Sequence, residues 1–164
     1  MISDPDRRHL HRCLELAAEA LAAGNQPFGS VLVSAEDVVL FEDHNRGANG
    51  DRTQHPEFAI ARWAANNMTP EERTRATVYT SGEHCPMCSA AHGWVGLGRI
   101  VYASSTEQLT RWLSDFDVPA SPVRPLRIGE VIVDAEVDGP VEEFADQIRK
   151  LHAAFHARQG LSST

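Results

Sequence analysis

The sequence predicts one α/β domain in which helices pack against a sheet. Three observations support this prediction: the chain has 164 residues, apolar residues recur at helical spacing in several segments, and short β-branched runs lie between those segments. A chain of this length has the size of one domain and buries a substantial core. The order helix, hairpin, helix, strand, helix, strand predicts a layered fold whose later strands can run parallel.

The chain is predicted to open with a helix and a hairpin. Leucines and alanines recur at helical spacing over residues 6–23, and Gly24 is typical of the position after a helix end. The β-branched runs 28–33 and 38–41 are separated by the polar residues 34–37, which predicts a hairpin.

The later elements are predicted from the same two patterns, apolar residues at helical spacing and short β-branched runs. In chain order they are a helix over 56–66, a helical turn from Thr69, a strand over 76–80, a helix over 86–97, a strand over 99–103, a proline-rich loop over 118–129, a short strand over 131–133 and a closing helix over 141–156. On the closing helix, His152 and His156 form an i, i+4 pair that we expect at the surface.

Charge and hydropathy limit the partners. The formal net charge is −8, and acidic residues concentrate over 134–146, so a nucleic acid would be repelled there. A small neutral or cationic substrate fits better. No apolar run approaches the roughly 20 residues that span a bilayer, and residues 1–12 are charged where a signal peptide is apolar. We therefore expect a cytoplasmic protein with reduced thiols and no membrane partner.

Two short motifs carry candidate chemistry. In His55-Pro56-Glu57 and Cys85-Pro86-Met87-Cys88, a potential metal ligand directly precedes a proline that opens a predicted helix. The positive potential of a helix N-terminus favours the thiolate that a metal needs. Two thiolates and one imidazole suit Zn²⁺ and leave a fourth position for water. Glu57 would then be free to take a proton from that water and pass it to a departing amine.

Two other interpretations of the cysteine pair remain open. A thioredoxin-like redox pair would leave His55 and Glu57 without a role. A closed structural zinc site, completed by His84 or His92, would have no use for Glu57. We expect His92 instead to be a buried histidine with satisfied hydrogen bonds.

With these residues in place, the chain resembles the cytidine deaminase superfamily of zinc-dependent deaminases. The two motifs match the H-x-E and P-C-x-x-C signature of that superfamily in order and spacing. The segment Pro27-Phe28-Gly29-Ser30-Val31-Leu32-Val33, the pair Asn45-Arg46, and Trp94 are similar to the guanine and cytosine deaminase branch. One difference is that His84 stands where the family has a proline.

The resemblance implies a three-layer α/β/α fold with a central five-stranded mixed sheet, usually as a homodimer. It implies that His55, Cys85 and Cys88 bind zinc and that Glu57 is the catalytic proton shuttle. It also implies substrate contacts from Asn45, Phe28, Ser30 and Trp94. Residues from about 104 onward would select the substrate, and a carboxylate there, such as Asp115, Asp117 or Glu143, would hold ring nitrogens of the base.

The resulting functional hypothesis is hydrolytic deamination of a free nucleobase or analogue, with release of ammonia. The candidate rings are cytosine, guanine, isocytosine, azapurines and s-triazines. The alternatives are a nucleoside deaminase, a tRNA adenosine deaminase, and a zinc-stabilised scaffold without catalysis.

Overall fold

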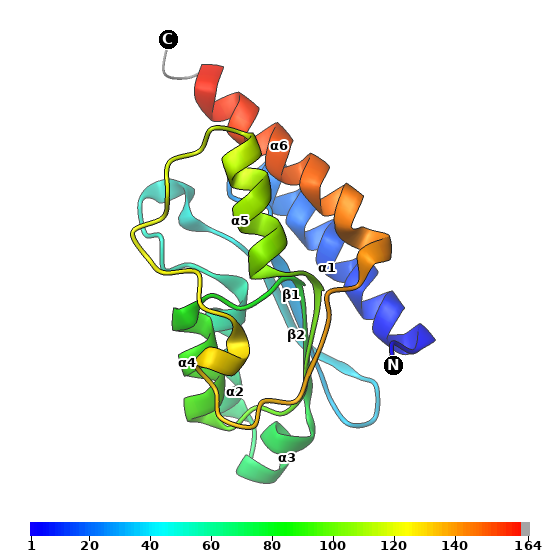
Figure 1. Ribbon diagram of the computed structural model, residues 1–164. Coiled ribbons are helices and arrows are strands. Elements are labelled where there is room, and N and C mark those ends of the chain that lie inside the picture. The colour runs from blue at the N-terminus through cyan, green and yellow to red at the C-terminus, as the bar shows by residue number, and fades with distance from the viewer. Residues whose placement is uncertain (162–164) are drawn as a thin grey trace.

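The computed structural model describes residues 1–161 and has three layers, with helices on both faces of a five-stranded sheet (Figure 1). The strands are β1 (Gly29–Val33), β2 (Val39–His44), β3 (Thr77–Gly82), β4 (Ile100–Ser104) and β5 (Val137–Asp138). The α-helices are α1 (Asp4–Ala22), α2 (Pro56–Asn67), α3 (Pro70–Arg75), α4 (Pro86–Val95), α5 (Thr106–Asp115) and α6 (Ala145–Leu161). Three short 3₁₀ helices are η1 (Gly47–Asn49), η2 (Ile128–Glu130) and η3 (Glu142–Phe144).

The sheet is mixed, as predicted. Its order is β2-β1-β3-β4-β5. β1 pairs antiparallel with both β2 and β3, whereas β3, β4 and β5 run parallel. The carboxyl ends of β3 and β4 therefore lie at the same edge, where ligand sites form in open α/β sheets.

Alternating strand residues supply a core on each face of the sheet. On one face, α1, α5 and α6 cover Val31, Val33, Tyr79, Val101 and Ala103. On the other face, α2 and α4 cover Leu32 and Val78, and residues 128–137 cover Ile100 and Tyr102. Figure 1 shows α1 and α6 together on one side of the sheet and α2 and α4 on the opposite side. Because side chains alternate along a strand, one sheet supports both layers.

Gly29 lets the first helix pack directly on the first strand. A Cβ atom at this position would lie 2.5 Å from both the Cys13 carbonyl oxygen and the Leu16 Cβ. Cys13 itself is fully buried in this contact, so it is a packed core residue. The close approach holds the start of β1, and with it Phe28 and Ser30, against a rigid helix.

Two expectations about the C-terminal part are wrong. Residues 131–133 form no strand, because Ile132 packs against the Ile100 cluster while Val133 is 87% exposed. The fifth strand is instead β5. His152 is not at the surface, since its ring is 2% exposed and packs edge-on against Phe28.

The sequence patterns also missed α5. The Ser105 hydroxyl caps this helix by accepting a hydrogen bond from the Gln108 backbone N–H, and the Gln108 Oε1 accepts one from the Ser105 backbone N–H. Trp112 anchors the helix in the core. Within residues 1–161, no helix is both long and apolar enough to cross a membrane.

Candidate active site

Two helix starts meet at the carboxyl edge of β3 and bring the motif residues together. His55 is the N-cap of α2 and Cys85 is the N-cap of α4, both with extended backbone and with proline at the next position. Each candidate ligand thus directly precedes the proline that opens its helix, as predicted. Neither side chain makes a capping hydrogen bond to its helix, so both can share a ligand.

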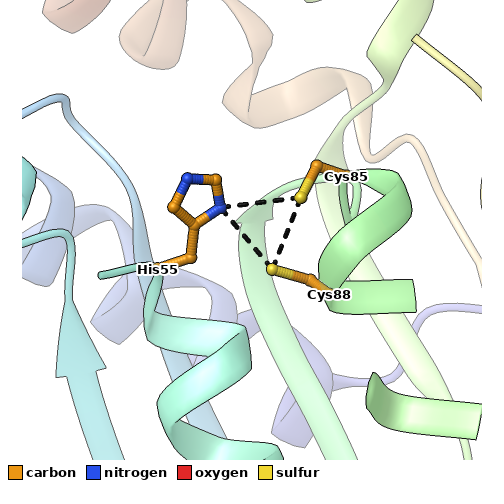
Figure 2. Close-up of side chains that lie close together, drawn as sticks. All are labelled: His55, Cys85 and Cys88. Atoms are coloured by element: carbon orange, nitrogen blue, oxygen red, sulfur yellow. Dashed lines mark hydrogen bonds between the residues drawn. The ribbon is translucent and has the colours of Figure 1, made fainter. Parts of the chain in front are cut away.

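The three predicted metal ligands form a tight triangle (Figure 2). The Cys85 Sγ lies 3.5 Å from the Cys88 Sγ and 3.6 Å from the His55 Nδ1, and the Cys88 Sγ lies 3.5 Å from the same nitrogen. Tetrahedral zinc with its usual bond lengths separates two sulfurs by about 3.8 Å and a sulfur from a nitrogen by about 3.6 Å. The donor set and its spacing therefore fit Zn²⁺ with a fourth position left open.

Only one of the three side chains favours the deprotonated form that a metal needs. Hydrogen bonds from Cys88 and His55 lower the pKa of Cys85 to about 4. The bond to Cys85 raises the pKa of His55, while the bond to Cys85 together with burial raises the pKa of Cys88. Because metal ligands must be deprotonated, binding would release protons from His55 and Cys88.

Glu57 lies beside the triangle with its two oxygens in different environments. The side chain is 6% exposed, and burial raises its pKa. Its Oε1 accepts a hydrogen bond of 2.7 Å from the Thr80 hydroxyl, and the Ser30 hydroxyl lies 3.0 Å from the same oxygen and 2.9 Å from the Thr80 Oγ1. Its Oε2 faces the Cys88 Sγ at 3.6 Å. One oxygen is thus held by hydroxyls and the other faces the metal position.

Thr80 is a site residue that the sequence patterns missed. It lies in the middle of β3, where a threonine has no signal beyond strand propensity. Ser30 was assigned to the substrate, yet its hydroxyl points to Glu57 and Thr80.

Asn45 and Phe28 lie next to each other at the start of β1. The Asn45 backbone N–H donates to the Phe28 carbonyl, and the buried Asn45 Oδ1 accepts from the Gly47 N–H at 2.9 Å. This bond orients the Asn45 amide, so its Nδ2 donor is the group left for another partner. The half-buried Phe28 ring packs between Gly82 and His152.

Two residues predicted to contact the substrate do not lie beside the metal-ligand cluster. Trp94 follows Pro86 by about 12 Å along α4, and its side chain is 90% exposed. Asp115 ends α5, about 14 Å from Thr106, and pairs with Arg149 at 3.3 Å.

The histidines beside the cluster do not join it. His84 is buried with its ring 5.3 Å from that of His92, and the two rings meet edge to face. His92 is buried as expected and its Nε2 bonds the Gly98 carbonyl, but its Nδ1 has no partner. The one metal-binding cluster found in the described part of the chain contains His55, Cys85 and Cys88 alone. This favours an open three-ligand site over a closed one.

A comparison with protein families matches the sequence that forms this site to a known family. The model described as the cytidine and deoxycytidylate deaminase zinc-binding region matches residues 3–104, more than half of the chain. The chain belongs to this deaminase family. The match confirms the resemblance predicted from the two motifs, and it ends where β4 ends.

Individual deaminases resemble the chain over different extents. A protein named "Probable cytosine deaminase" from Schizosaccharomyces pombe is 27% identical over 156 residues, which covers 88% of this chain and 95% of that protein. A tRNA-specific adenosine deaminase from Haemophilus influenzae is 32% identical over 104 residues, 63% of this chain and 60% of that protein. The solved structure of a guanine deaminase from Nitrosomonas europaea has a TM-score of 0.66 at 17% identity, and the match covers 93% of this chain and 86% of that one. The last match concerns the fold alone.

Proposed function

We propose that this deaminase is zinc-dependent and replaces the exocyclic amine of a free nucleobase or nucleobase analogue by a carbonyl, releasing ammonia. The observation that carries the proposal is the buried Glu57 carboxylate beside an open His55, Cys85 and Cys88 triangle. A redox pair or a closed structural site would need no such carboxylate. The candidate rings remain cytosine, guanine, isocytosine, azapurines and s-triazines.

Zn²⁺ held by the three ligands would supply a Lewis acid with an open position, which activates water as a nucleophile near neutral pH. The chain itself moves the protons. The Glu57 Oε2, which faces the metal position, takes a proton from the attacking water and delivers it to a ring nitrogen. It then takes the remaining proton from the new hydroxyl on the ring carbon and passes it to the leaving amine, so that the carbon–nitrogen bond breaks as the carbonyl forms. Thr80 and Ser30 hold the opposite oxygen and keep the carboxylate aimed. Burial raises the pKa of Glu57 toward the working pH of such a shuttle.

Asn45 supports recognition of a ring acceptor. Since its Oδ1 is held by the Gly47 N–H, its Nδ2 offers a donor to a carbonyl oxygen or ring nitrogen of the base. Phe28 would contribute an apolar wall near this donor. The segment after Ser104 would complete the pocket and select the ring.

We further propose a cytoplasmic homodimer. The exposed Trp94 on α4 is a large apolar side chain of the kind enriched in the centres of interfaces. The ligand thiols must be reduced to bind zinc, which suits the cytoplasm. Analytical ultracentrifugation of wild type and Trp94→Ser tests the dimer, and an unchanged dimer in the variant would exclude this face.

The second candidate function is tRNA adenosine deamination, which the likeness to the Haemophilus influenzae enzyme supports. The net charge of −8 and the acidic stretch 134–146 argue against an RNA partner. Filter binding of tRNA over a salt series separates the two candidates. Tight binding that weakens steeply with salt would favour the tRNA substrate.

The decisive experiment is ammonia release from a panel of free bases, analogues and their nucleosides, with zinc content measured on the same samples. Glu57→Ala is the blank, because it should keep zinc and lose turnover. Release from a free base, absent in the blank, is the expected result. A preference for nucleosides would correct the substrate class, and a zinc-loaded protein inert to every compound would favour a scaffold.

A further inference from the structure

Glu83 lies two residues before Cys85, close enough in sequence for its carboxylate to be a candidate contact for the metal or the substrate. Its contacts point elsewhere. The Glu83 Oε2 accepts a hydrogen bond of 2.8 Å from the Thr106 backbone N–H, and its Oε1 accepts one of 3.0 Å from the Ile128 backbone N–H. Both oxygens are therefore occupied by main-chain donors from the segment after β4.

Both donors stand at the start of a helix. Thr106 is the first residue of α5 and Ile128 is the first residue of η2. The first N–H groups of a helix have no partner within it, and a negative charge there is favourable. One carboxylate thus caps two helices at once.

Glu83 also bonds to the end of β4, which directly precedes α5. The Glu83 backbone N–H donates to the Ser104 carbonyl at 2.8 Å, and the Ser104 hydroxyl donates to the Ser81 carbonyl at 2.8 Å. In Figure 1, α5 leaves the end of β4 and the chain returns through a long loop to η2. Glu83 therefore connects both Thr106 and Ile128 to the loop that carries Cys85.

We infer that Glu83 is a positioning residue that locks the substrate-selecting segment, residues 104–130, onto the metal-binding loop. Both of its carboxylate oxygens accept backbone N–H groups of this segment, and it is not part of the His55, Cys85 and Cys88 cluster. It fixes the position of the segment relative to Cys85 and Glu57. The inference deepens the proposed function and rests on it only for the effect on substrates, since the contacts themselves are independent of the reaction.

The test compares wild type with Glu83→Gln and Glu72→Gln in the zinc-loaded protein. A glutamine keeps one acceptor oxygen but presents an amide to the second backbone donor. Glu72 is the matched control, because its carboxylate also accepts a backbone N–H, from Thr69 at 2.7 Å, but on α3. Zinc content, amide hydrogen exchange and steady-state kinetics are measured on each protein.

We expect Glu83→Gln to keep zinc and to exchange amides at 104–108 and 126–130 at least about tenfold faster, equivalent to about 1.4 kcal/mol. KM for the best base should rise about tenfold while kcat changes less than about threefold. Glu72→Gln should leave these exchange rates and KM unchanged. Unchanged exchange in Glu83→Gln, or loss of its zinc, would overturn the inference.

A second variant keeps the test valid if Glu83→Gln folds poorly. Thr106→Pro removes the donor and leaves Glu83 in place, and proline suits the first position of a helix after the extended Ser105. It should speed exchange at 107–110 alone, and normal exchange there would count against the lock. If exchange responds as expected while no compound releases ammonia even in wild type, the lock is supported and the proposed function fails.

Discussion

The chain up to Ser104 and the chain beyond it are built differently. In the first region, helix starts and strand ends converge on buried side chains, and the family model covers almost all of it. In the second region, the loop over 119–125 is exposed and β5 has only two residues. The second region is anchored by a few core side chains from α5, η3 and α6 and by the Glu83 contacts.

This difference suggests a division of roles: the region up to Ser104 carries the reaction, and the region after it governs substrate preference. The proposed metal ligands and the proposed proton shuttle lie on elements packed from both faces of the sheet, where small displacements are resisted. Residues 105–161 contribute nothing to the candidate metal cluster, and Thr106 and Ile128 bond to Glu83, which precedes Cys85. Changes in the first region should therefore remove activity, whereas changes in the second should alter stability or substrate preference.

The largest effect is expected from Cys88→Ala. Loss of one thiolate from the triangle should reduce zinc binding strongly and bring ammonia release down to the Glu57→Ala blank. Metal analysis after dialysis and the ammonia assay measure both. Cys13→Ala is the matched control: it removes a buried thiol that is not in the cluster, so it should keep zinc and activity at a stability cost of about 1 kcal/mol. Full zinc occupancy in Cys88→Ala would contradict the assigned ligand set.

Thr80→Val should have the next largest effect. It removes the 2.7 Å hydrogen bond to the Glu57 Oε1, and a bond to a charged group contributes about 1.5–3 kcal/mol, so kcat should fall about 10- to 100-fold with zinc retained. The Thr80 bond lowers the pKa of Glu57, so its loss raises that pKa. Because the ionised carboxylate acts as the base, the acid limb of the pH–rate profile should move to higher pH.

Thr77→Val, at the start of β3, is the control for Thr80→Val and should change neither kcat nor the profile. An unaltered acid limb in Thr80→Val would mean that Glu57 is not the group that titrates there.

His152→Phe tests the second region through stability. Burial lowers the pKa of His152 to about 3, below the ordinary 6.5. Between these two values the unfolded chain binds a proton that the folded chain does not, so stability falls as pH falls. Between pH 7 and 5 wild type should lose about 2 kcal/mol more than His152→Phe. Urea unfolding at both pH values measures the difference, and contributions common to both proteins cancel.

His156→Phe, one turn on and less buried, should flatten the pH dependence less. Equal pH dependence in wild type and His152→Phe would show that the imidazole is accessible to protons in the folded state.

The difference between the two regions also explains what the sequence could predict. His55, Glu57, Cys85 and Cys88 were predictable because proline-led helix starts are local signals, and the structure brings their side chains together. The burial of His152 was not, since it depends on Phe28 and Trp112 from distant segments. Glu83 was hidden for the same reason, because its partners lie 23 and 45 residues further along the chain.

The smallest effect is expected from Asp115→Asn, although the sequence suggested this carboxylate for binding ring nitrogens. Its partner is Arg149, and both side chains are about half exposed, so the pair contributes at most about 1 kcal/mol. We expect kcat and KM for a free base to stay within about twofold of wild type. A tenfold rise in KM with unchanged stability would instead place the end of α5 at the bound substrate. Selectivity would then depend on a rearrangement of the C-terminal region, and the separation between the two regions would hold only for the free enzyme.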